Sequence, residues 1–290
     1  MEASYPAPAW LVARSREFTA SGATAATPRR AATVVLLRPA SGSFEVYALR
    51  RAATMAFAPS MYAFPGGSVD ARDAIAEAAG EVAWRGPAPS WWAARLNLPE
   101  AEAAAVVCAA VREVFEECGV LLASPRILEG SRAGSASLYE SPDRLVGDVS
   151  GPEWQAARQA LVRRELGLAE FLAANGLAVR SDLLVPWDRW LTPEFEAYRF
   201  DAFFFVARMP EGQEARHDTE ADDAQWLRPA DALGLPMLPP TRHTFTLLAQ
   251  LPDIDAVLAL GADRAVTAPV LPRLHTAADG THLVTLTTEP

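Results

Sequence analysis

The sequence contains little cysteine and histidine and carries an excess of negative charge. Its 290 residues include two cysteines and four histidines, and the net charge is −10. Cys108 and Cys118 lie on one predicted helix, about 15 Å apart along its axis, which is too far for a disulfide bond. The lack of a disulfide framework predicts a protein of a reducing compartment with two buried thiols.

The sequence also lacks the signals of several other function classes. The histidines are scattered without the spacing of zinc ligands. The negative charge argues against nucleic acid and acidic membrane surfaces as partners. No apolar run reaches the length of about 18 residues that marks a membrane span. No targeting signal stands out, so we expect a cytoplasmic protein, and a phosphorylated small molecule stays open as its substrate.

The order of predicted strands and helices indicates an α/β fold. Residues 32–37 and 44–49 predict a hairpin, and the apolar run 198–207 predicts a central strand. Residues 1–30 predict a loose arm with room for one short helix, and residues 74–98 predict an irregular segment. The remaining predicted elements are short strands at 61–64, 225–227 and 282–287, and helices at 152–175 (broken near Gly167), 229–233, 241–251 and 253–260.

The helix predicted over residues 99–119 has an unusual charge distribution. At about 100° per residue, Glu113, Glu116 and Glu117 fall within a sector of roughly 100°. Only Arg112 is positive beside them, although like charges four positions apart destabilise a helix. Clustered carboxylates suit a hard divalent cation, so the pattern predicts a magnesium or manganese site. Apolar residues occupy the opposite face: Val107, Val111, Val114 and Cys118.

A pair of glycines stands upstream of this helix. Gly66 and Gly67 follow Pro65, directly after the short strand at 61–64. Because glycine has no Cβ, backbone amides near it can approach a ligand closely, as they do in phosphate-binding loops. The pair alone is typical of a simple turn. A strand, a glycine loop and an acidic helix together indicate a site for phosphate and metal.

These residues together resemble the signature of the Nudix hydrolases, Gly-x5-Glu-x7-Arg-Glu-U-x-Glu-Glu-x-Gly-U, in which U is a bulky aliphatic residue. Gly67 matches the first glycine, and Asp73 stands where the family has a glutamate. The second half of the signature matches at every fixed position: Arg112, Glu113, Val114, Glu116, Glu117, Gly119 and Val120.

The signature is interrupted by an insertion. It spans about 23 residues in the family and 54 residues from Gly67 to Val120 here, so about 31 residues are inserted. A subgroup that includes the mammalian peroxisomal coenzyme A diphosphatase carries an insertion at the same point. The resemblance covers most of residues 32–235. Three segments resemble that subgroup: Met61-Tyr-Ala-Phe-Pro-Gly-Gly, Cys108-Ala-Ala-Val-Arg-Glu, and Trp190-Leu-Thr-Pro with the following Arg199-Phe-Asp.

The resemblance implies metal ligands and a group that orients them. Glu116 and Glu117, with Glu113 as a further ligand, would hold Mg²⁺ or Mn²⁺. Arg112 would keep one of these carboxylates in its productive rotamer through a bidentate pair. The expected reaction, attack of water on phosphorus, needs this neutralisation of phosphate charge.

Further residues are expected to contact the substrate. The backbone near Gly66 and Gly67 would complete the metal or phosphate shell. Arg50 or Arg51, at the end of a strand facing the loop, would bind a phosphate, with a solvated strand end as the alternative. Asp73 is left outside the core site, because its side chain is shorter than the family's glutamate and the insertion follows it directly.

The general base has two candidates. The family takes it from Glu113 or from a distal loop glutamate shortly before a strand with a tryptophan. In the loop before Trp226, Glu220 best fits that spacing, and Asp222 and Asp223 compete with it. A merely solvated acidic loop is an equally open interpretation.

The resemblance implies a Nudix-type α/β/α sandwich with a mixed β-sheet. We expect an N-terminal arm (1–30) and one domain (31–290) with an inserted segment near 74–98 and a C-terminal extension near 236–290. The implied activity is metal-dependent hydrolysis of a nucleoside diphosphate linked to another moiety, with coenzyme A or acyl-CoA as the leading substrate. ADP-ribose, dinucleotide polyphosphates and a non-catalytic nucleotide sensor stay open as alternatives, and so does a homodimer.

Overall fold

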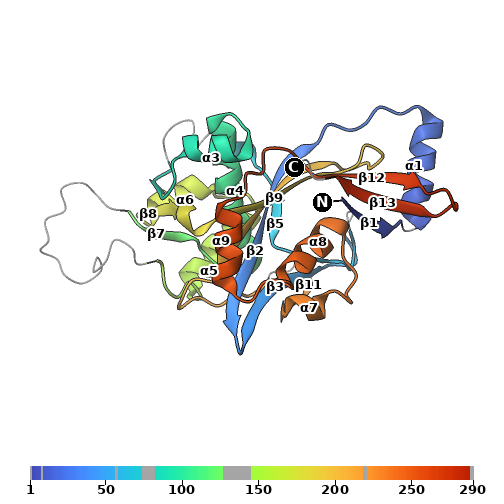
Figure 1. Cartoon of the computed structure of the whole chain (residues 1–290). Helices are drawn as coiled ribbons and strands as arrows, with labels where there is room; N and C mark the ends of the chain where they lie inside the picture. Colours follow the sequence, from blue (N-terminus) through green and yellow to red (C-terminus); the bar gives the residue numbers. More distant parts are fainter. Residues whose placement is uncertain are drawn as a thin grey trace, which may run out of the picture.

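A seven-stranded mixed sheet forms the centre of the structure, a computed structural model that describes residues 2–7, 9–55, 58–73, 82–126, 145–217 and 221–287 (Figure 1). The strand order is β11-β3-β2-β10-β9, with β4 paired to β3 and β5 paired to β2. β10 runs parallel to β2, and the other neighbours are antiparallel. The strands are β2 (Arg29–Ala40), β3 (Ser43–Arg51), β4 (Tyr62–Ala63), β5 (Gly66–Ser68), β9 (Val185–Leu191), β10 (Phe200–Arg208) and β11 (Ala221–Leu227).

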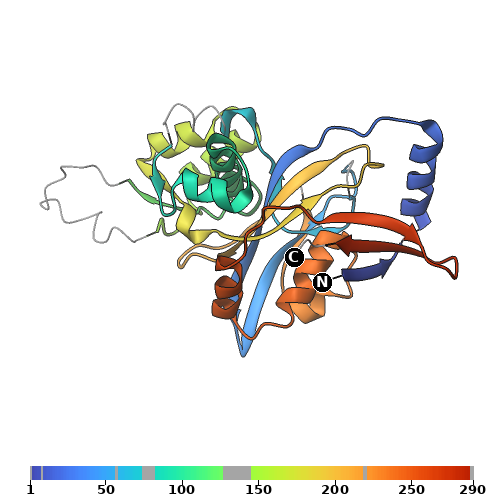
Figure 2. The same ribbon diagram turned by 45° about the horizontal axis from the view of Figure 1, so that its top comes forward.

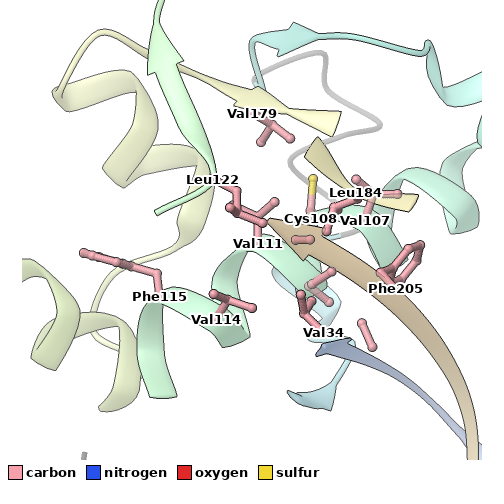
Figure 3. Close-up of a cluster of buried hydrophobic side chains, with 14 of the residues drawn as sticks. Val34, Val107, Cys108, Val111, Val114, Phe115, Leu122, Val179, Leu184 and Phe205 are labelled. Carbon is pink, nitrogen blue, oxygen red and sulfur yellow. The ribbon is translucent and has the colours of Figure 1, made fainter. Parts of the chain in front are cut away.

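Helices cover both faces of this sheet. Successive side chains of β2 point to opposite faces. Val34 belongs to a core cluster with α4 (Glu100–Cys118), and Val35 to a second cluster with α8 (Pro239–Leu248) and α9 (Ile254–Ala262). Figure 3 shows Val34 of the sheet in one cluster with Val111 of α4. The predicted α/β/α sandwich with a mixed sheet is confirmed.

A smaller lobe packs around the outer side of α4 (Figure 2). The described part of the predicted insertion, residues 82–98, is not irregular as expected. It forms β6 and α3, because Trp92 of α3 is fully buried with its ring edge-on to Phe205 at 5.7 Å. The lobe consists of β6 (Trp84–Arg85), α3 (Pro89–Leu96), β7 (Ala123–Pro125), α5 (Pro152–Val162), α6 (Leu168–Ala174), β8 (Leu177–Arg180) and the 3-10 helix Ser181–Leu183.

The smaller lobe contains a second sheet, of order β6-β8-β7. The two ends of the described chain meet in a third sheet, of order β1-β13-β12. It joins β1 (Glu2–Pro6), β12 (Leu271–Thr276) and β13 (His282–Thr287), and α1 (Ala9–Ser21) follows β1. The prediction of a loose N-terminal arm is therefore wrong for β1, whereas the one short helix that it allowed forms as α1. The reason is long-range pairing, since β1 lies antiparallel to β13 and the Ala7 amide donates to the His282 carbonyl at 2.8 Å.

Most of the other predicted elements are confirmed, and β9 was missed. The hairpin, the central strand, the broken helix, α7 (Pro229–Ala232), α8, α9 and β13 all form where expected. The sequence of β9 does not show the pattern of a strand, because it contains Pro186 and two charged residues, Asp188 and Arg189. Arg189 pairs with Asp201 on β10 at 2.8 Å.

Asp188 of β9 carries a buried carboxylate. Its side chain accepts a hydrogen bond from the Arg189 amide at 3.0 Å, and His243 Nε2 lies 4.0 Å away. Burial raises the pKa of Asp188 to about 6, partly opposed by the positive charge of Arg264.

The described helices include none whose length and apolar character would let it span a membrane.

Candidate active site

The acidic residues lie on the last two turns of α4. The helix ends at Gly119, whose φ of 66° is the left-handed conformation that favours glycine. Every residue from Ala103 to Val111 is buried, so the helix is fixed along its length before the acidic turns begin. The predicted bounds and apolar face of this helix are confirmed.

The two glycines of β5 are both in close contact with other groups. A Cβ on Gly66 would meet the backbone of β2, with Thr33 Cα at 2.7 Å. A Cβ on Gly67 would lie 2.5 Å from Glu113 Oε1. Ordinary van der Waals contacts are about 1 Å longer, so only glycine lets β5 pair with β2 and lets the Glu113 carboxylate approach the loop. The amide of Gly66 donates to Glu117 Oε2 at 2.8 Å.

Arg112 is the centre of a buried network of carboxylates. Its Nη1 lies 2.8 Å from Glu113 Oε1 and 3.2 Å from Glu116 Oε2. Its Nη2 donates to the Ser68 carbonyl at 2.9 Å and to Asp73 Oδ2 at 3.1 Å. One guanidinium thus joins the acidic turns of α4 to the loop that follows β5, as a bidentate fork is suited to do.

Asp73 therefore belongs to the site, contrary to the prediction that left it outside. It is 4% exposed, and its Oδ2 also accepts from the Asp70 amide at 2.9 Å. The short side chain reaches Arg112 because the loop after β5 returns to α4 before the insertion leaves it.

Burial shifts the pKa of two glutamates of the site. Burial raises the pKa of Glu113 to about 7, with Arg112 opposing and Glu116 adding to the shift. Burial also raises the pKa of Glu116, again opposed by Arg112. Glu113 and Arg112 are each 8% exposed, so solvent does little to screen these charges.

The residues fit a hard divalent cation in donor chemistry and in charge. Three carboxylates, of Asp73, Glu113 and Glu116, pair with Arg112, and a fourth, of Glu117, accepts from the Gly66 amide. In the described parts of the chain, no three acidic, histidine or cysteine side chains are arranged to hold a metal ion as they stand. The carboxylate oxygens are instead engaged by Arg112 and by the Gly66 amide.

The acidic turns of α4 and the glycine loop line one large cavity of about 950 Å³. Glu113, Glu116, Glu117, Gly66 and Gly67 all contribute to its wall. The structure thus brings together the predicted metal ligands and the predicted phosphate loop. This volume is at the upper end of the range of about 300–1,000 Å³ that is usual for small-molecule sites.

The structure separates the two arginines that were predicted to bind phosphate. Arg51 lines the cavity, whereas Arg50 is exposed and lies outside the cavity wall, because neighbouring strand residues point to opposite faces. Of the candidate bases, Glu113 lines the cavity and Glu220 lies outside the described residues. The competitors Asp222 and Asp223 are not part of the cavity wall.

Sequence reasoning missed most of the opposite wall of the cavity. Trp10, Leu11 and Arg14 of α1 line it, together with Val284 of β13. Their sequence signals were the possibility of one short helix in the first thirty residues and the predicted strand at 282–287. Nothing local connects that helix with a strand near residue 284.

Comparison with known proteins agrees with this arrangement. No family model matches the chain. The acyl-coenzyme A diphosphatase NUDT19 of Gallus gallus is 29% identical over 300 residues, which cover 87% of this chain and 76% of that protein. NUDT19 of Homo sapiens is 30% identical over 244 residues, covering 70% of this chain and 62% of the human protein.

A solved structure shares the fold over nearly its whole length. The crystal structure of a NUDIX hydrolase from Alicyclobacillus acidocaldarius has a TM-score of 0.60 and 28% sequence identity, and the match covers 84% of this chain and 99% of that one. The fold, the acidic helix and these relatives make the chain similar to the hydrolases of the Nudix family. Among Nudix hydrolases, it is similar to the acyl-coenzyme A diphosphatases named NUDT19.

Proposed function

We propose that the chain hydrolyses the diphosphate of coenzyme A or of an acyl-CoA, in the presence of Mg²⁺ or Mn²⁺. The observation that carries this proposal is the common cavity wall formed by the glutamates of α4 and the glycines of β5. Water attacks one phosphorus of the diphosphate, and the bond from that phosphorus to the bridging oxygen breaks. The products are a mononucleotide and the phosphorylated remainder of the substrate.

Glu116 and Glu117, with Glu113 as a further ligand, would hold the metal. When bound, the divalent cation neutralises phosphate charge and lowers the pKa of water. Arg112 positions the carboxylates, since its guanidinium contacts Glu113 and Glu116 at 2.8 and 3.2 Å. These distances support an orienting role that a lysine, with a single point charge, would not fill.

Phosphate oxygens contact the loop at Gly66 and Gly67 and the side chain of Arg51. Both glycines line the cavity beside the glutamates of α4, which supports contact between the phosphate and this loop. Arg51 adds a positive charge on the same cavity wall. Arg50, which points away from the cavity, is the weaker candidate for this role.

The attacking water loses its proton to a carboxylate. Glu113 is the first candidate for this base, because its carboxylate lines the cavity beside Glu116 and Glu117. Glu220, on the loop before β11, is the second candidate. The rate of hydrolysis by a Glu220→Gln variant separates the two candidates, because a large loss of rate would assign the role of base to Glu220.

Coenzyme A is the preferred substrate class because both NUDT19 relatives are named for acyl-CoA hydrolysis. ADP-ribose and dinucleotide polyphosphates contain the same diphosphate linkage. They are therefore the controls that any substrate test has to include.

The test is a substrate screen with Mg²⁺, in which chromatography separates the released mononucleotide. Coenzyme A, octanoyl-CoA, ADP-ribose and a diadenosine polyphosphate are compared at equal concentration, with and without a chelator. We expect turnover of the coenzyme A compounds that the chelator abolishes. Faster turnover of ADP-ribose than of either coenzyme A compound would refute the substrate assignment. Turnover that the chelator does not affect would refute the requirement for a divalent metal.

A substitution on α4 tests the site itself. Glu116→Gln removes one charge from the metal-binding face, so we expect the rate to fall about a hundredfold or more. Glu100→Gln is the matched control, because Glu100 is exposed on the first turn of the same helix and lies outside the cavity. Equal rates for both variants would exclude Glu116 from the site, provided that thermal unfolding shows both to be folded.

A further inference from the structure

The cavity extends from α4 to a second end formed by α1 and the third sheet. α1 and α4 lie on opposite sides of the molecule in Figures 1 and 2, yet residues of both helices line the same cavity. The diphosphate site at Gly66, Gly67 and the glutamates occupies only the α4 end. A volume of about 950 Å³ leaves room for a large further part of the substrate at the α1 end.

The wall of the α1 end is mainly apolar. The lining residues here include Trp10 and Leu11 of α1, Phe200 of β10, Tyr198 of the preceding loop and Val284 of β13. Trp10 is 45% exposed and Tyr198 is 58% exposed, although large apolar side chains are usually buried. Exposed aromatic groups around a cavity mark a surface that a ligand covers.

An ion pair and a threonine hydroxyl of this end are bonded within the chain. Arg14 Nη1 contacts Glu196 Oε2 at 2.5 Å, so the two charges cancel. The Thr192 hydroxyl donates to the Phe200 carbonyl and accepts from the Phe200 amide. Against such a wall, the polar edge of a nucleobase would lack hydrogen-bond partners. An aliphatic chain has no polar groups that need such partners.

The α4 end differs in charge. Arg112 and the glutamates line it, and Arg72 and Arg164 add positive charge around Asp70. The charged nucleotide and diphosphate are therefore suited to the α4 end, and an uncharged chain to the α1 end. The cavity is divided in the same way as an acyl-CoA molecule, which has a charged nucleotide at one end and an apolar chain at the other.

We propose that the α1 end of the cavity binds the acyl chain of the substrate, and that Trp10 and Leu11 make the enzyme prefer long chains. This inference rests on the proposed function. α1 forms a fixed wall because β1 pairs with β13 on one side of it and Arg14 pairs with Glu196 on the other. Each methylene buried there raises kcat/KM up to about fourfold.

The test measures kcat/KM with Mg²⁺ for coenzyme A and its butanoyl, octanoyl and dodecanoyl thioesters. We expect about a tenfold rise or more from butanoyl to octanoyl in the wild type. Leu11→Glu places a carboxylate against the chain, so the ratio of octanoyl-CoA to coenzyme A should fall about tenfold. Trp10→Ala should lower the same ratio by a few-fold. Trp91→Ala is the control, because Trp91 is 36% exposed on α3 and lies outside the cavity, and it should leave the ratio unchanged.

A binding measurement separates this inference from the proposed function. Calorimetric titration with dodecanoate detects an apolar site without any turnover. If no coenzyme A compound is hydrolysed but dodecanoate binds the wild type and not Leu11→Glu, the proposed function fails and the apolar site stands. If coenzyme A compounds are hydrolysed at rates independent of chain length, the proposed function stands and this inference is refuted. If dodecanoate binds wild type and Leu11→Glu equally, α1 does not form the site.

Discussion

Adjacent glycines of β5 should respond to the same substitution in opposite ways. A Cβ on Gly66 would collide with the β2 backbone, at 2.7 Å from Thr33 Cα and closer still to the Ala32 carbonyl oxygen. Backbone within a paired sheet cannot give way cheaply. A Cβ on Gly67 would meet only the far end of the Glu113 side chain, at 2.5 Å. Gly66→Ala should therefore destabilise the fold, and Gly67→Ala should move a catalytic group.

The magnitudes follow from these contacts. Forcing a methyl group into packed structure costs about 1–3 kcal/mol, which in a protein of this size lowers Tm by roughly 5 °C for Gly66→Ala. In Gly67→Ala the Glu113 carboxylate has to retreat by about 1 Å to reach van der Waals distance, and a misplacement of about 1 Å costs about a hundredfold in rate. Its Tm should stay within about 2 °C of the wild type, because alanine also restricts the unfolded chain.

Calorimetry and kcat/KM for the substrate found in the screen test this pair of predictions. Gly66→Ala is expected to lose activity as well, because the Gly66 amide donates to Glu117. The distinguishing result is thus a normal Tm with low activity for Gly67→Ala alone. A Gly67→Ala variant with normal turnover would show that the position of Glu113 does not matter. Equal falls in Tm for both variants would show that the clash at Gly67 is not confined to a side chain.

Two further predictions concern buried carboxylates. Asp73→Ala should lower the free energy of unfolding by about 3 kcal/mol, the low end for a broken buried pair, since Arg112 keeps Glu113 and Glu116. Glu100→Gln, exposed on the first turn of α4, is the control in urea titrations. Asp188 holds its proton up to about pH 6 in the folded state and to about 3.8 when unfolded. Folding therefore becomes less favourable as pH rises between these values, and the cost reaches about 3 kcal/mol at pH 7. Asp188→Asn should be more stable than the wild type by up to that amount at pH 7, and the gain should shrink towards pH 4; a gain that does not depend on pH would contradict the ionisation argument.

The parts of the site that could be predicted are those encoded locally. The bounds of α4, its apolar face and its three glutamates follow from spacing within one helix. The glycine loop is recognisable because Gly66 and Gly67 stand directly after a short strand. In each case, a few consecutive residues determine the geometry, so the sequence suffices.

Asp73 could not be placed, for a reason that the structure makes clear. Its partner Arg112 is 39 positions away, and part of the insertion lies between them. The shorter side chain and the insertion both favoured exclusion, but neither shows which partner the fold brings close to Asp73. A buried guanidinium with three other contacts still needs charge, and the nearest carboxylate on the loop supplies it.

The α1 end of the cavity was beyond prediction because it depends on contacts between the two ends of the described chain. β1 pairs with β13 through backbone hydrogen bonds, which carry almost no sequence signature. β9 was hidden for a related reason, since buried Asp188 and paired Arg189 break the apolar pattern of a strand. Charged residues in a core are tolerated where tertiary partners exist, and those partners are invisible along the sequence.

The buried position of Glu113 links the stability of the fold to its chemistry. A helix that served only as packing would not place a carboxylate at 8% exposure between two other acidic groups and one guanidinium. Its pKa of about 7 means that, near neutral pH, the folded chain holds a proton there for much of the time. A divalent cation that binds the ionised carboxylate would displace that proton, so cation affinity rises with pH through this range. Burial of Glu113 makes its ionised form unfavourable in the protein without a cation. A divalent cation stabilises that ionised form, so the same burial favours binding of a positively charged ligand.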